Sequence, residues 1–165
     1  MKLENKRLFI SALAATLLVA VSAQAADWPV WGGDGSRNMV SFEKDIVLEF
    51  DPGRMNEDEV VDMKTTKNVK WVAKLGSQAY GNVTVADGRV YVGTNNESPR
   101  DADKKGDRGI VMCLNEKTGK LEWQLVIPKL GAGKVSDWEY IGVCSSPAIE
   151  GNRAYVVTNK CEVVC

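Results

Sequence analysis

The sequence contains no histidine, which removes the commonest general base and the commonest metal ligand from its chemistry. It also has no excess of positive charge, because 21 basic residues stand against 22 acidic ones. Proteins that bind nucleic acid through its phosphates need a basic surface, so nucleic acid is not expected as a partner. The four cysteines include no adjacent pair and no Cys-x-x-Cys-His sequence, which excludes a c-type haem attachment site.

Long apolar runs are also scarce, and the only one lies at the start of the chain. Three basic residues precede it, it extends from Leu8 to Val21, and the small-residue sequence Ala23-Gln24-Ala25 follows. These features predict a secretory signal peptide over residues 1–25, cleaved after Ala25. An uncleaved anchor is the alternative, but a membrane span needs about 20 apolar residues. We expect a periplasmic or secreted product with no transmembrane span after cleavage.

Four cysteines in an exported chain raise the question of disulfides, but their spacing does not fix a pairing. Cys113 and Cys165 follow apolar pairs at equivalent positions of a repeat, which is typical of buried sites where cysteine acts as a small hydrophobe. Cys144 and Cys161 lie near the ends of predicted strands, and a bridge between them is one alternative.

The second half of the chain repeats itself. Residues 85–95 return as residues 149–159, with Arg, Tyr, Val, Thr and Asn in register at five of eleven positions. An internal repeat of this size predicts stacked β units. The second copy reaches Cys165 before completing the pattern of the first, so we expect the chain to be the front part of a longer protein.

Alternating apolar residues and turn signals predict four short strands in each unit. In the first unit these strands cover residues 81–86, 89–94, 110–114 and 120–127. Asp87-Gly88 predicts a type I′ hairpin turn between the first two. The expected fold class is all-β: a β-propeller of four-stranded antiparallel blades, present here as about one and three-quarter blades.

We predict three parts: the signal peptide 1–25, an irregular segment 26–68 and a partial propeller 69–165. The propeller part is divided into a closing strand 69–75, a blade 81–127 and a truncated blade 143–165. Residues 69–75 alternate in polarity and end on the same pattern as the fourth strand of the blade. In propellers an N-terminal strand of this kind completes the last blade.

The ten residues that end at Trp123 (Leu-Asn-Glu-Lys-Thr-Gly-Lys-Leu-Glu-Trp) resemble the tryptophan-docking repeat of pyrroloquinoline quinone (PQQ) type β-propellers. The resemblance implies that Thr118 and Gly119 form the turn between the third and fourth strands. It also implies that the bare peptide at Gly119 receives the tryptophan of a neighbouring blade, with Trp71 and Trp123 as docking rings. Asn115 stands where aspartate is usual and keeps an oxygen that caps the turn.

Two kinds of protein share this repeat: quinoprotein dehydrogenases, which bind PQQ with calcium, and non-enzymatic propellers such as the outer-membrane assembly lipoprotein BamB. The dehydrogenases carry an adjacent cysteine pair that has no counterpart here, so no catalytic, cofactor-binding or metal-binding residue is assigned. We expect an exported binding or scaffold module. The alternatives are the N-terminal part of a PQQ-dependent alcohol or sugar dehydrogenase, and a partial propeller that self-associates to complete its ring.

The loop between the second and third strands is longer than its counterpart in the second unit, which makes it the candidate site for a ligand or partner. We expect a protein or small molecule to bind this face of the propeller. Lys105 and Met112 stand where an EF-hand loop requires its fifth and twelfth ligands, so no metal site is expected. The candidate residues are Asn95, Asn96, Arg100, Asp101 and Asp103.

Overall fold

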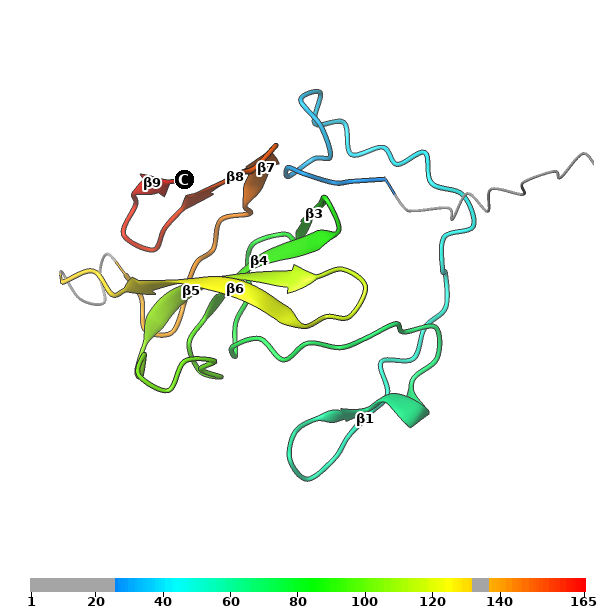
Figure 1. Cartoon of the computed structure of the whole chain (residues 1–165), viewed down its shortest axis with the longest axis horizontal. Coiled ribbons are helices and arrows are strands. Elements are labelled where there is room, and N and C mark those ends of the chain that lie inside the picture. Colours follow the sequence, from blue (N-terminus) through cyan, green and yellow to red (C-terminus); the bar gives the residue numbers. More distant parts are fainter. Residues whose placement is uncertain (1–25, 132–136) are drawn as a thin grey trace, which may run out of the picture.

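The computed structural model describes residues 26–131 and 137–165, and over these residues the protein is all-β with antiparallel sheets (Figure 1). The predicted signal peptide lies outside the described residues. The strands are β1 (Arg54–Met55), β2 (Val61–Asp62), β3 (Thr84–Ala86), β4 (Arg89–Asn95), β5 (Arg108–Asn115), β6 (Leu121–Pro128), β7 (Ala148–Glu150), β8 (Arg153–Val157) and β9 (Val163–Val164). A single 3-10 turn, η1 (Met63–Thr65), follows β2.

Strands β3 to β6 form a four-stranded antiparallel sheet in chain order, called here the first sheet. The hairpin between β3 and β4 turns at Asp87 and Gly88, whose φ angles are 51° and 72°. Both central residues are therefore left-handed, as a type I′ turn requires, and the predicted hairpin is confirmed. The other three predicted strands are confirmed as β4, β5 and β6, whereas β3 is shorter than predicted.

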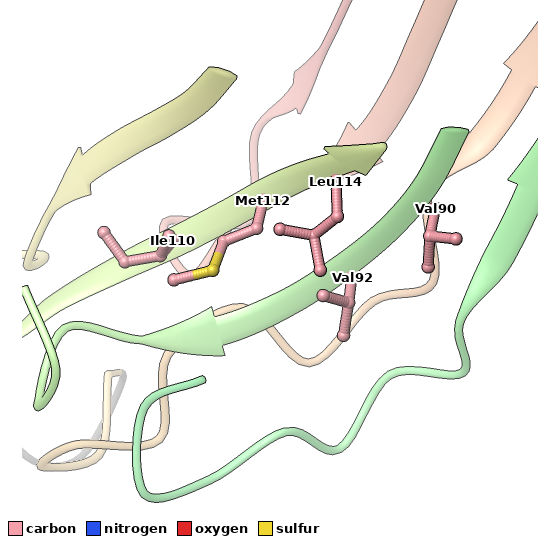
Figure 2. Close-up of a cluster of buried hydrophobic side chains, with 5 residues drawn as sticks. All are labelled: Val90, Val92, Ile110, Met112 and Leu114. Carbon is pink, nitrogen blue, oxygen red and sulfur yellow. The ribbon is translucent and has the colours of Figure 1, made fainter. Parts of the chain in front are cut away.

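The two central strands of the first sheet, β4 and β5, are buried on both faces, whereas the edge strand β6 is largely exposed. One face carries an apolar cluster of side chains from β4 and β5, shown in Figure 2: Val90, Val92, Ile110, Met112 and Leu114. The opposite face of β5 presents Val111, which packs with Val143 and Val156 from the second unit. A strand with apolar residues on both faces has no solvated side, which explains the continuous apolar sequence of β5.

Residues 69–75 differ from their prediction in one respect. Alternate side chains are half-buried, and Trp71, Ala73 and Leu75 pack against the apolar cluster of β4 and β5, as their periodicity predicts. Within the described residues, however, this segment pairs with no strand and is extended chain rather than a strand. Side-chain packing holds it in place without a hydrogen-bonded ladder.

Strands β7, β8 and β9 form a three-stranded second sheet with the same meandering order as β3 to β5. The N-terminal segment joins the two sheets, since Trp28 pairs with Val85 on β3 through two backbone hydrogen bonds of 2.8 and 3.0 Å. The next residue, Pro29, accepts a hydrogen bond from the backbone of Ile149 on β7 at 2.8 Å. Figure 1 shows this segment beside β3 and β7.

The rest of the segment 26–68 has little regular structure. β1 and β2 form a small hairpin that lies apart from the two sheets in Figure 1. Several large apolar side chains between Met39 and Phe50 are exposed, with Phe42 and Leu48 about 90 % accessible. No helix in residues 26–131 and 137–165 has both the length and the apolar character needed to cross a bilayer.

Candidate functional site

The turn between β5 and β6 is organised by the side chain of Asn115. Its Oδ1 accepts hydrogen bonds from the backbone N–H groups of Lys117 and Thr118 at 3.0 and 3.1 Å. The hydroxyl of Thr118 donates to the same oxygen at 3.2 Å. Gly119 completes the turn with a φ of 68° and donates its N–H to the Asn115 carbonyl at 2.8 Å. The turn therefore needs a residue without a side chain at position 119.

The indole of Trp71 lies directly on the bare face of Gly119. A Cβ atom on Gly119 would lie 2.5 Å from Cδ2 of the ring, so a larger residue cannot be added without moving the indole. Nε1 of Trp71 donates a hydrogen bond to the carbonyl of Glu116 at 2.7 Å. The ring therefore gains apolar contact on one side and keeps its polar atom satisfied, which is what a buried tryptophan requires.

Trp123, which matches Trp71 in the sequence repeat, lies in a different environment. Its side chain stands on β6 and is 42 % exposed. Its ring centroid is 6.0 Å from that of Tyr91 with the planes tilted by 59°, and this is its aromatic contact in the described part of the chain. No residue in that part accepts a hydrogen bond from its indole N–H. The structure therefore brings Thr118, Gly119 and Trp71 together and leaves Trp123 apart from them.

Trp123 opens onto a groove of about 860 Å³ between β6 and the second sheet, called here the Trp123 groove. One wall is the outer face of the first sheet and the other is formed by β7, β8 and the end of the chain. Among the described strands β6 pairs only with β5, so its outer edge keeps backbone groups free for another strand. The apolar residues of the lining include Tyr91, Trp123, Leu125, Ile149, Val156 and Val164.

The candidate residues in and next to the loop between β4 and β5 differ in their exposure. Asn95 and Asn96 are 0 % and 6 % exposed, and their amides are used inside the chain. Asn96 donates to the carbonyls of Lys104 and Gly106 at 2.6 and 2.9 Å, which holds the loop closed. Both amides are engaged in hydrogen bonds within the chain.

The other candidate residues of this loop reach its surface. Arg100 is exposed and its guanidinium donates to the carbonyl of Lys74. Asp101 accepts the N–H of Asp103 at 3.0 Å and forms a local turn, while the carboxylate of Asp103 is exposed. Of the five residues singled out, Arg100, Asp101 and Asp103 are the ones that reach the surface, and their ligand role stays a prediction.

Asn95 has a role that the sequence reasoning missed. Its Nδ2 donates to the hydroxyl of Ser77 at 2.9 Å and to the carbonyl of Tyr140 at 2.6 Å. Its Oδ1 accepts the N–H of Ser77 at 3.1 Å. Asn95 thus joins β4 to the chain before the first sheet and to the chain before the second. Asn159, its equivalent in the repeat, donates in the same way to the carbonyl of Pro128 at 3.2 Å. The recurrence of Thr-Asn in both copies was the sequence signal for this role.

A buried ion-pair cluster at the start of the second unit was also missed. The carboxylate of Asp137 is fully buried and accepts a hydrogen bond from Lys129 at 2.6 Å. It also accepts the N–H of Leu130 and the amide of Asn159, both at 2.8 Å. Lys129 lies 3.4 Å from a second carboxylate, that of Asp107. These residues come from separate stretches of the chain, and no sequence pattern links them.

We expect stability to fall in acid partly because of Asp137. Burial alone would raise the pKa of this carboxyl, but its hydrogen bonds and the charge of Lys129 lower the pKa below its usual value. A lowered pKa in the folded state contributes stability above about pH 4, and this contribution is lost as the pH falls through the folded-state value. Asp137→Asn should cost about 2 kcal/mol at neutral pH and progressively less as the pH falls.

Urea unfolding of the wild type and the Asp137→Asn variant between pH 7 and pH 3 measures this effect. Asp103→Asn is the matched control, because its carboxylate is exposed and should contribute little. A constant difference between the wild type and Asp137→Asn across this range would show that the ion pair does not link folding to pH.

The described residues contain no group of three Cys, Asp or Glu side chains placed to hold a metal ion. The described part of the site consists of the Trp123 groove, the unpaired outer edge of β6 and the polar loop between β4 and β5. Comparison with models of protein families and with curated proteins finds no match for this chain.

Proposed function

We propose that the chain belongs to an exported β-propeller of the PQQ-like repeat type and acts as a binding or scaffold module without catalytic chemistry. The contact of Trp71 with Gly119 carries this proposal. It places an indole from one segment on a Thr-Gly turn of the next unit, which is the docking arrangement that the resemblance implies. BamB-like propellers use such units as scaffolds, and the same role fits this chain.

The way the two sheets meet supports the propeller proposal. Val143 is fully buried between them and donates its N–H to the carbonyl of Thr94 on β4 at 3.1 Å. Gly93 faces the backbone of Val143, where a Cβ atom would collide with it. Gly109 on β5 leaves similar room for Asn159. Glycine at these points lets successive units stack closely, as adjacent blades do.

The Trp123 groove is the proposed binding surface, and its proposed partner is a β-structured protein segment. The unpaired edge of β6 offers backbone hydrogen bonds to an added strand. Trp123 offers an indole like that of Trp71, which in the first unit is covered by a glycine turn. A partner with a strand and a Thr-Gly turn satisfies both features, whereas a compact small molecule would leave the strand edge unpaired.

The groove can be tested with a peptide taken from the chain itself. A peptide of residues 108–128 with Trp123→Phe contains the Thr-Gly turn and no tryptophan, so the protein supplies all of the fluorescence. Binding should shift the emission of Trp123 to shorter wavelength, and a Trp123→Phe protein should show no shift. A matched peptide with Gly119→Val, whose turn is covered, should bind at least about tenfold more weakly. Equal binding of the two peptides would contradict turn recognition.

The proposal assigns no PQQ–calcium site to the described residues. Calcium needs several carboxylate or carbonyl oxygens, and no suitable cluster of acidic residues occurs in residues 26–131 and 137–165. We expect no PQQ binding in equilibrium dialysis with calcium, and no dye-linked oxidation of alcohols after both are added to the protein. Stoichiometric PQQ or dye-linked turnover would overturn the non-catalytic proposal in favour of the quinoprotein dehydrogenase.

A further inference from the structure

Two of the four cysteines line one groove at the end of the second sheet. Cys144 and Cys161 are both exposed free thiols, and both border a hollow of about 460 Å³. The hollow is called here the cysteine groove, and its other walls include Trp138 and Ile141. The remaining two cysteines are absent from its lining.

Backbone and side-chain hydrogen bonds fix the two segments that carry these thiols. Ser145, next to Cys144, donates its hydroxyl to the carbonyl of Val157 at 2.7 Å and accepts the N–H of Val157 at 3.1 Å. Beyond Val157 the chain turns back toward β9, and Cys161 donates its N–H to the carbonyl of Thr158 at 3.0 Å. Both cysteines therefore lie at the same end of β8, on segments that are tied to its last residues.

We propose that Cys144 and Cys161 form a disulfide that joins the segment before β7 to the turn between β8 and β9. The bond would close a loop across the second sheet, at the end where β8 turns back toward β9. The proposal uses predicted export only to place the chain in an oxidising compartment. The geometry and the test below do not depend on export or on the proposed binding role.

The reaction is a thiol–disulfide exchange with a disulfide donor, which is the oxidant. The thiolate of Cys161 attacks one donor sulfur, forming a mixed disulfide and releasing the first donor thiolate. The thiolate of Cys144 then attacks the sulfur of Cys161 in the mixed disulfide and displaces the second donor thiolate. The two cysteine thiols lose two electrons and two protons, and the donor disulfide becomes two thiols. Partial burial raises the pKa of the Cys144 thiol and the Asp137 carboxylate adds to this. The reaction balances in the same way if Cys144 attacks first.

The other two cysteines are poorly placed for this reaction. Cys113 is completely buried, and burial raises its pKa to about 11, which keeps it protonated and inaccessible. Cys165 follows Val164, which pairs with Val156 on β8, and it borders the Trp123 groove instead. The two cysteines that border the cysteine groove are therefore the pair that we propose.

The test uses the 165-residue chain with Cys165→Ser, so that each tryptic peptide carries one cysteine of interest. The reduced protein is incubated with excess oxidised glutathione, blocked with iodoacetamide and digested with trypsin under non-reducing conditions. We expect residues 135–153 linked to residues 161–165 within monomeric protein. The same treatment in guanidinium chloride measures how much of the linked peptide forms in the unfolded chain. The yield of linked peptide from the native protein should be about tenfold higher.

Several outcomes overturn the proposal: alkylated or glutathione-capped Cys144 and Cys161, a link from either to Cys113, an intermolecular link, or equal yields with and without denaturant. A second measurement supports the assignment. Oxidation should raise the unfolding midpoint by about 5–15 °C, and Cys144→Ser should abolish this shift. An unchanged midpoint in a protein shown to carry the link would contradict the stabilising role.

Discussion

Replacing Gly119 with alanine is expected to destabilise the fold by about 3 kcal/mol. Two effects combine. Alanine at a φ of 68° is strained by about 1 kcal/mol. The new Cβ would also lie 2.5 Å from the indole of Trp71, which must move away and lose both its packing and its hydrogen bond to Glu116.

Gly88 provides the matched control for this prediction. It lies in a turn of the same sheet with a φ of 72°, but no atom lies within 4 Å of a Cβ built there. Gly88→Ala should therefore carry only the backbone strain, about 1 kcal/mol. Urea unfolding of both variants, followed by circular dichroism, gives the comparison. An equal decrease in the free energy of unfolding for the two variants would mean that the indole of Trp71 does not pack closely against Gly119.

Removing the indole itself should have the largest effect on stability. Trp71→Ala is expected to cost about 4 kcal/mol, because it empties the space beside the β4–β5 cluster and exposes the Thr-Gly turn. Trp123→Ala should cost about 1 kcal/mol, because this ring is 42 % exposed and has few contacts. The same chemical change thus has unequal consequences at two equivalent positions of the repeat.

A double variant shows whether Trp71 and Gly119 act through each other. In the Trp71→Ala background, Gly119→Ala should cost only its backbone strain of about 1 kcal/mol, so the two single effects should not add. Circular dichroism of denaturant unfolding measures all four proteins of the cycle. Strict additivity would indicate that the two residues stabilise the fold independently, and comparable losses at Trp71 and Trp123 would show that both rings are docked.

Local sequence signals predicted most of the first sheet. Asp87 and Gly88 both favour the left-handed backbone conformation, which predicted the hairpin turn. The long apolar sequence of β5 corresponds to its burial on both faces. The segment 69–75 shows the limit of such reasoning. Its periodicity correctly gave the buried face, but periodicity reports which side chains are buried and not whether the backbone has a strand to pair with.

The site was harder to predict, because local sequence patterns do not show which polar side chains are buried or which distant residues they contact. Asn95 ends β4 and Asn96 begins the long loop after it, a position typical of ligand sites, yet both amides form hydrogen bonds within the fold. The buried carboxylate of Asp137 owes its role to Lys129 and to Asn159, which lies 22 residues away. The repeated Thr-Asn pair was the one sequence feature that indicated a structural role for Asn95 and Asn159.

The central claim is that equivalent tryptophans of the repeat differ, with Trp71 docked on a glycine turn and Trp123 open to a groove. Hydrogen exchange of the indole N–H groups tests it directly by NMR, with Trp71→Phe and Trp123→Phe assigning the signals. The hydrogen bond from Trp71 to Glu116 predicts slow exchange for that indole, and the exposed ring of Trp123 predicts fast exchange. Equal exchange rates, or slower exchange at Trp123, would contradict the account.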